Sequence, residues 1–149
     1  MSQGRKKVVP ELIRFLKERG HTVLSEHLGE DYPFGAQAKK MGLKEEELTP
    51  DLLWYQDVAW IEEADCMIAE VSVPGSDGRG GEIQHFCSRE GLGLSLAPLL
   101  MIHEEGEGNP SAAIQSRPLK NSLFHLKGYK DLEEAKQIIL KFLRESNLE

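Results

Sequence analysis

The chain has 149 residues, a length that suits one domain with a substantial core. Hydrophobic residues make up 40% of it and charged residues 29%, which is ordinary for a soluble globular protein. The net charge of -7 argues against a general nucleic-acid-binding surface, which needs a basic face, but it does not exclude a small phosphorylated ligand held by a few backbone N–H groups and one Arg.

The sequence shows neither a signal peptide nor an apolar run of membrane-spanning length. Its two cysteines, Cys66 and Cys87, fit no disulfide framework or zinc spacing. We therefore expect one domain over residues 1–149, without a membrane partner, in a reducing compartment. That compartment is the cytoplasm, or the nucleus if the source is eukaryotic.

The first third of the chain predicts a helix, a strand and a long polar connection. Apolar residues at helical spacing predict the helix over residues 8–19. A short strand is expected at 22–25. Residues 30–47 are polar and interrupted by Gly, so we expect a loop with one or two helical turns there.

The middle of the chain predicts a helix, a buried strand and a second helix. Thr49 as N-cap and Pro50 at the first helical position predict a helix that runs to about Ala64. The near-continuous apolar run at 66–73 predicts a strand covered on both faces. A Ser/Gly-rich loop follows, and the next helix is expected over 80–90.

The last third predicts strands at 98–102 and 122–126, a polar turn between them at 104–109, and a closing amphipathic helix over 132–143. Alternating helices and strands indicate the α/β class. We predict a flavodoxin-like open parallel sheet with helices on both faces.

Two carboxylates in the middle of the chain suggest a reaction. Asp57 lies on the helix before the buried strand, and Glu82 follows the Ser/Gly-rich loop after it. This order can place both carboxylates at one end of a parallel sheet. Paired carboxylates of this kind do glycosyl chemistry, one as nucleophile and one as acid.

Three consecutive segments here are DVAWIEEAD, AEVS and Ser76-x-Gly78-x-Gly80-x-Glu82, flanked by the weaker TVLSEH and PSAAI. Together they resemble the nucleoside 2-deoxyribosyltransferase superfamily, most closely its 2'-deoxynucleoside 5'-phosphate N-hydrolase branch. The resemblance implies that Glu82 attacks the anomeric carbon and expels the base. It implies that Asp57 donates a proton to the base or orients it.

Each role has a plainer alternative. A Glu in a first helical turn can simply support the helix, and a helical Asp is usually solvated. As a nucleophile, Glu82 should be ionised, which a helix start favours. As an acid, Asp57 needs its pKa raised by burial or by the charge of Glu82.

Small residues at Ser76, Gly78 and Gly80 would let a backbone loop approach a phosphate, although an ordinary turn also uses them. The transferase branch places an Asp at the position of Ser76, to bind a free 5'-hydroxyl. A hydroxyl accepts a phosphate where a carboxylate would repel it, so the resemblance favours a nucleoside monophosphate.

Other substrate-binding residues rest on the resemblance. Ser111 would reach the phosphate site of a partner subunit, which implies a homodimer with shared active sites; its alternative is a helix N-cap. Gln3, Gly4 and Arg5 match the remainder of a Gly/Arg turn, and Arg5 could pair with a phosphate. His27 follows the strand at 22–25, where the family contacts its ligand.

The chain departs from the family at its start, where the first strand, usually central in the sheet, is expected to be missing or truncated. We expect no cofactor and no metal, because the Glu82-x-x-His85 spacing lacks further ligands. Trp54, Tyr55 and Trp60 lie near Asp57, where an aromatic ring could stack on a base or pack in the core. Three functions remain open: an N-hydrolase of nucleoside 5'-monophosphates, a deoxyribosyltransferase that exchanges bases, and a catalytically impaired nucleotide-binding dimer.

Overall fold

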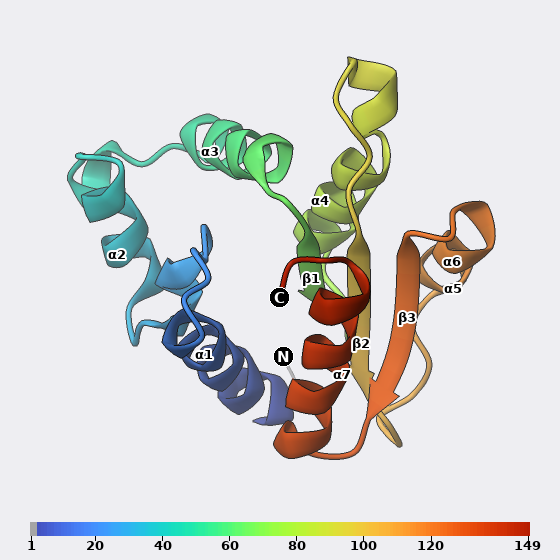
Figure 1. The fold of residues 1–149 in the computed structure, drawn as a ribbon. Helices are drawn as coiled ribbons and strands as arrows, with labels where there is room; N and C mark the ends of the chain where they lie inside the picture. Colours follow the sequence, from blue (N-terminus) through green and yellow to red (C-terminus); the bar gives the residue numbers. More distant parts are fainter. Residues whose placement is uncertain (1–2) are drawn as a thin grey trace.

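A three-stranded parallel sheet forms the centre of the molecule (Figure 1). The structure, a computed structural model, describes residues 3–149, with side chains from Lys7 onward. The strands are β1 (Met67–Glu70), β2 (Leu99–Glu104) and β3 (Phe124–Tyr129), in the order β1-β2-β3. The predicted open parallel α/β sheet is therefore confirmed.

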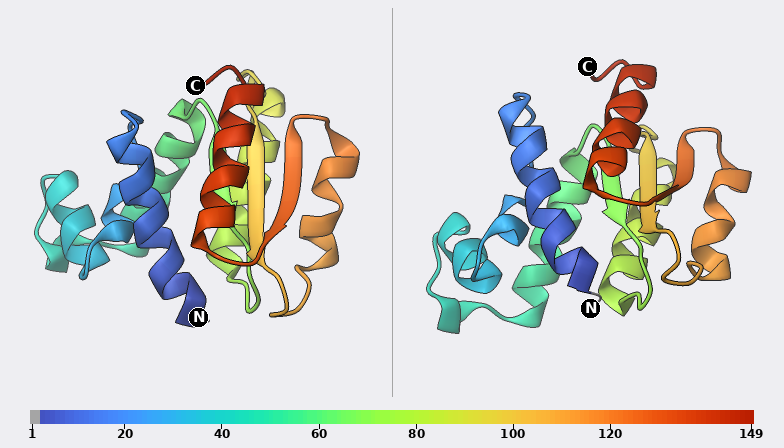
Figure 2. Two further views of the ribbon diagram at one scale, coloured as in Figure 1. Left: turned by 60° about the horizontal axis from the view of Figure 1, so that its bottom comes forward. Right: turned by 90° about the horizontal axis from the view of Figure 1, so that it is seen from below.

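Helices cover both faces of the sheet (Figure 2). Because successive strand residues point to opposite faces, β2 divides its side chains between two cores. Leu100 and Ile102 pack with α1 (Gln3–Glu18) and α7 (Leu132–Glu145). Leu99 and Met101 pack with Ile83 and Phe86 of α4 (Asp77–Cys87). This two-sided burial explains the continuous apolar runs of the strands.

The remaining elements lie at the two sides of this core. On one side, η1 (Glu26–Gly29), α2 (Pro33–Lys40) and η2 (Glu45–Glu47) connect α1 to α3 (Pro50–Glu63) (Figure 1). On the other side, η3 (Arg89–Leu92) follows α4, and α5 (Ala112–Gln115) and α6 (Arg117–Lys120) lead to β3. The start of α3 is as predicted: the Thr49 hydroxyl accepts the Leu52 N–H at 3.3 Å, with Pro50 as the first helical residue.

Two expectations about the first third of the chain are wrong. Residues 22–25 do not form a strand, because no neighbouring strand lies there to complete its hydrogen bonds among residues 3–149. The expected turn at Gln3, Gly4 and Arg5 is instead the start of α1, whose sequence is rich in good helix formers. Within the described residues, β1 is accordingly an edge strand, as the missing first strand predicted.

The prediction that a loop extends to residue 80, before Glu82, is also wrong. The Ser76 hydroxyl accepts the Arg79 N–H at 3.3 Å, so α4 begins at Asp77 rather than at residue 80. Ser is a strong N-cap, and this bond satisfies one of the free N–H groups of the helix start. Gly78 and Gly80 therefore belong to the first turns of α4, and Glu82 lies in its second turn.

Candidate active site

The α3 helix ends just before β1, α4 begins just after it, and the two helices pack against each other. Asp57 on α3 lies close enough to Glu82 on α4 for its charge to act on that carboxyl group. A buried arginine secures this arrangement. The Arg89 guanidinium donates to the carbonyl oxygen of Ala64 at 2.7 Å and so caps the end of α3.

The environment of the pair disfavours negative charge. Burial, together with the charge of Asp57, raises the pKa of Glu82 to about 7. Burial also raises the pKa of Asp57. The expectation that the helix start would favour ionised Glu82 is therefore wrong, because desolvation outweighs the dipole of α4. Because Asp57 acts on Glu82 as a negative charge, the proton that the pair holds near neutral pH resides on Glu82.

An aromatic and an imidazole ring lie beside the pair. The indole of Trp54 rests on α4 so closely that a Cβ added at Gly81 would be 3.5 Å from its Cη2. The same indole meets the ring of His85 edge-on, with 6.5 Å between centroids. His85 Nε2 in turn lies 2.9 Å from a carboxylate oxygen of Glu62 on α3. These contacts add three links between α3 and α4 around Glu82.

The N-terminus of α4 is exposed and unobstructed. Side chains added at Gly78 or Gly80 would meet no atom within 4 Å, so packing within the protein does not require glycine at either position. Ser76 is also exposed. Arg79, in the same turn, holds a buried Nη1 that has no hydrogen-bond partner among the described residues. This turn can therefore offer a hydroxyl, backbone N–H groups and a guanidinium to an anion. Arg79 was not predicted from the sequence, although its place inside the Gly-rich motif was a usable signal.

A second polar cluster that the sequence analysis missed lies at the carboxyl ends of the strands. The Ser72 backbone N–H and hydroxyl both donate to the buried Glu70 carboxylate. The Tyr129 hydroxyl donates to the same oxygen at 3.2 Å, and Ser72 Oγ accepts the Glu104 N–H at 2.8 Å. Burial, with the charge of Glu70, raises the pKa of Tyr129. The cluster ties all three strand ends to the segment that leads into α4, and polar residues at consecutive strand ends were its signal in the sequence.

The other predicted binding residues are His27 and Ser111, whose surroundings the structure describes, and Gln3 and Arg5, whose side chains it does not describe. His27 is buried, its ring is 5.3 Å from that of Trp60, and burial lowers its pKa. The ring packs against Trp60 rather than facing solvent, and a ligand contact of His27 stays a prediction. Ser111 is exposed at the N-cap of α5, and its hydroxyl makes no capping bond. The side chains of Gln3 and Arg5 lie outside the described residues.

Comparisons with known proteins identify the family. No family model matches the chain. It is 35% identical over 127 residues to a protein of Thermofilum pendens, covering 85% of this chain and 77% of the relative. A relative from Methanosarcina mazei is 31% identical over 131 residues, covering 87% and 69% of the two chains. Both are named "Putative 2'-deoxynucleoside 5'-phosphate N-hydrolase 1". The chain belongs to the 2'-deoxynucleoside 5'-phosphate N-hydrolase family.

The fold agrees with this assignment. A solved structure of Clostridium botulinum CMP N-glycosidase matches with a TM-score of 0.63 and 24% identity, over 93% of this chain and 91% of that one. The sequence resemblance to the N-hydrolase branch is thus confirmed, and the chain is a member of a glycosidase family.

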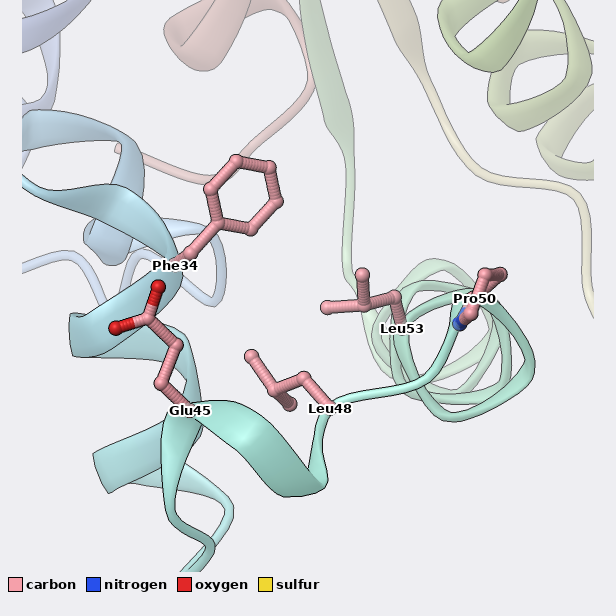
Figure 3. Close-up of a pocket in the computed structure, with 5 residues that line it drawn as sticks. All are labelled: Phe34, Glu45, Leu48, Pro50 and Leu53. Carbon is pink, nitrogen blue, oxygen red and sulfur yellow. The ribbon is translucent and has the colours of Figure 1, made fainter.

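One pocket of this N-hydrolase family member lies away from the carboxylate pair. A pocket of about 300 Å³ between α2, η2 and α3 is lined by Phe34, Glu45, Leu48, Pro50 and Leu53 (Figure 3). Phe34, Leu48 and Leu53 point into a common space, and neither Asp57 nor Glu82 lines it. We place the candidate site at the carboxylate pair, because Glu45 is the single carboxylate among the residues that line this pocket and glycosyl chemistry uses two.

Among the described residues, no group of His, Cys, Asp and Glu side chains has the arrangement of a metal site. In the same part of the chain, every helix is too short or too polar to cross a membrane.

Proposed function

We propose that this chain hydrolyses the N-glycosidic bond of nucleoside or 2'-deoxynucleoside 5'-monophosphates, with Glu82 as nucleophile and Asp57 as proton donor. The observation that carries the proposal is the half-buried carboxylate pair between α3 and α4. Retaining glycosidases use two carboxyl groups in this way. The relatives' names indicate a nucleotide as the substrate.

In the first step, ionised Glu82 attacks C1' and forms a glycosyl ester. The C1'–N bond breaks, its electron pair goes to the base, and protonated Asp57 gives its proton to the base. In the second step, Asp57 takes a proton from water, and the water oxygen attacks C1'. Glu82 leaves as a carboxylate, and the sugar 5-phosphate is released. This sequence starts from the singly protonated pair. The proton that resides on Glu82 in the free protein moves to Asp57 before the attack, which leaves Glu82 ionised.

The N-terminus of α4 would hold the phosphate. The support is the exposed Ser76 hydroxyl, the unobstructed backbone at Gly78 and Gly80, and the unpartnered Arg79 Nη1. A phosphate beside Ser76 lies between one and two helical turns, about 9 Å along the axis, from Glu82, because Ser76 caps the helix whose second turn carries Glu82. Phosphate binding would thus place the sugar beside the nucleophile.

The test is incubation with each nucleoside and 2'-deoxynucleoside 5'-monophosphate, with and without a second free base, followed by separation of the products. We expect release of free base and sugar 5-phosphate, and loss of both in Glu82→Gln. Formation of a new nucleotide from the added base would indicate a transferase. Absence of both products with a well-folded protein would overturn the proposal in favour of a nucleotide-binding role.

We also propose a homodimer in which Ser111 of one subunit completes the phosphate site of the other. Its exposed, uncapped hydroxyl supports this role. Glu82→Gln and Ser111→Asp should each be inactive as homodimers. Mixing them after unfolding and refolding should restore about a quarter of the wild-type activity, because half of the dimers are hybrids with one intact site. No recovery in a mixture shown to be dimeric would exclude shared sites.

A further inference from the structure

Trp54 is the large aromatic side chain whose surface remains open next to the carboxylate pair. It is 42% exposed and lies one helical turn before Asp57 on α3. On α4 its ring touches the positions of Gly81 and His85, which flank Glu82 in the sequence. The indole therefore borders the site where C1' must sit.

The other aromatic residues of α3 do not have this placement. The ring of Trp60 is already occupied, with the His27 ring 5.3 Å from it and the Lys40 ammonium 4.8 Å from its centroid. Tyr55 is 70% exposed, but it follows Trp54 directly and so points about 100° away around the helix. Only Trp54 combines contact with α4 and an open surface among these three.

We propose that Trp54 is the stacking platform for the nucleobase of the substrate. The inference rests on the proposed function and adds the residue that recognises the leaving group. The base is bonded to the carbon that Glu82 attacks, so its ring must lie within a few Å of the carboxylate pair. An exposed indole there offers a flat apolar surface, and bases of any identity can stack on it.

Gly81 lies directly against the same indole ring. A Cβ at this position would make an ordinary contact with the indole, so Gly81→Ala should leave the ring in place. A longer branched side chain, as in Gly81→Leu, would collide with the ring and displace it. Substrate binding should therefore weaken in Gly81→Leu and not in Gly81→Ala.

The binding test uses tryptophan fluorescence in the Glu82→Gln background, where the substrate is not consumed. The probes are the four 2'-deoxynucleoside 5'-monophosphates and, as a control without a base, 2-deoxyribose 5-phosphate. We expect the nucleotides to quench the emission and the sugar phosphate to leave it unchanged. The quench should survive Trp60→Phe, the matched control, and disappear in Trp54→Phe. A quench that persists in Trp54→Phe would overturn the inference.

The kinetic test separates stacking from a purely structural role. Trp54→Leu should raise KM about 5- to 150-fold, the range expected for one base–aromatic stack, while Trp54→Phe stays within a few-fold of wild type. Thermal unfolding shows whether each variant is folded. If Trp54→Leu does not fold, Trp54→Phe and Gly81→Leu still test whether the base stacks on Trp54. Unchanged KM in folded Trp54→Leu would show that the base binds elsewhere. If nucleotides quench the tryptophan emission of wild type but no base is released, the proposed function is wrong while the proposed stacking site is retained.

Discussion

Glu82 is half-buried and lies close enough to Asp57 for their charges to interact; this burial, together with the charge of Asp57, raises the pKa of Glu82 to about 7. A carboxyl group with a pKa near 7 makes the stability of the protein depend on pH, and the activity as well if Glu82 is the nucleophile that we propose.

Glu82→Gln should stabilise the protein at alkaline pH and not at acid pH. The folded-state pKa of Glu82 is above its usual value of 4.5, so its favourable contribution is complete below that value and is lost as the pH rises through about 7. Gln cannot ionise, so it avoids this loss. We expect the variant to be more stable by about 2 kcal/mol at pH 8 and nearly equal at pH 4.5. Urea unfolding at both pH values measures this, with exposed Glu63→Gln on α3 as control.

The pH dependence of activity should move when Asp57 loses its charge. In wild type, kcat/KM should fall as the pair loses its single proton through about pH 7. Asp57→Asn removes the second cause of the raised pKa of Glu82 and the proposed proton donor, so the fall near pH 7 should disappear. The residual activity should rise as Glu82 ionises at a lower pH, and the maximum rate should be reduced. A fall near pH 7 that persists in folded Asp57→Asn would mean that another group controls it.

Ser76→Asp should reverse the preference for a phosphate. Asp caps helices as well as Ser does, so α4 should remain formed while the site gains a negative charge. Repulsion between this charge and the phosphate is on the order of 1–4 kcal/mol, depending on the effective dielectric. The measurement is the ratio of kcat/KM for a deoxynucleoside monophosphate over that for its nucleoside. Asn has the shape of Asp without its charge and also caps helices, so Ser76→Asn should keep the wild-type ratio of kcat/KM values. A wild type that already prefers the nucleoside would favour the transferase.

Arg79→Met should weaken phosphate binding without weakening the fold. The buried Nη1 of Arg79 has no partner among the described residues, so its removal breaks no hydrogen bond that they make. A hydrogen bond to a charged group is worth about 1.5–3 kcal/mol, so KM for the monophosphate should rise roughly 10- to 150-fold. The exposed Arg14→Met on α1 is the matched control. Equal loss of affinity for the nucleoside and the monophosphate would contradict a phosphate contact.

The sequence by itself determined the features that depend on local signals. Thr49 and Pro50 marked the start of α3 because capping chemistry is local, and apolar runs predicted parallel strands because both faces of such a sheet are buried. The motif that joins Asp57 to Glu82 was also enough to indicate the N-hydrolase family, which the relatives confirm.

Only the tertiary structure decided what depends on neighbours distant in the chain. Residues 22–25 have strand character, but a strand needs a hydrogen-bonding partner, and none lies beside them in the described part of the chain. The burial of His27 and the contact of its ring with Trp60 could likewise not be read from the sequence. Glu82 looked ionised from its place in a helix, whereas its protonation depends on how much water α3 excludes and on where Asp57 lies. Burial and electrostatic coupling are properties of packed surfaces, so the sequence can name the acidic pair but cannot set its charge.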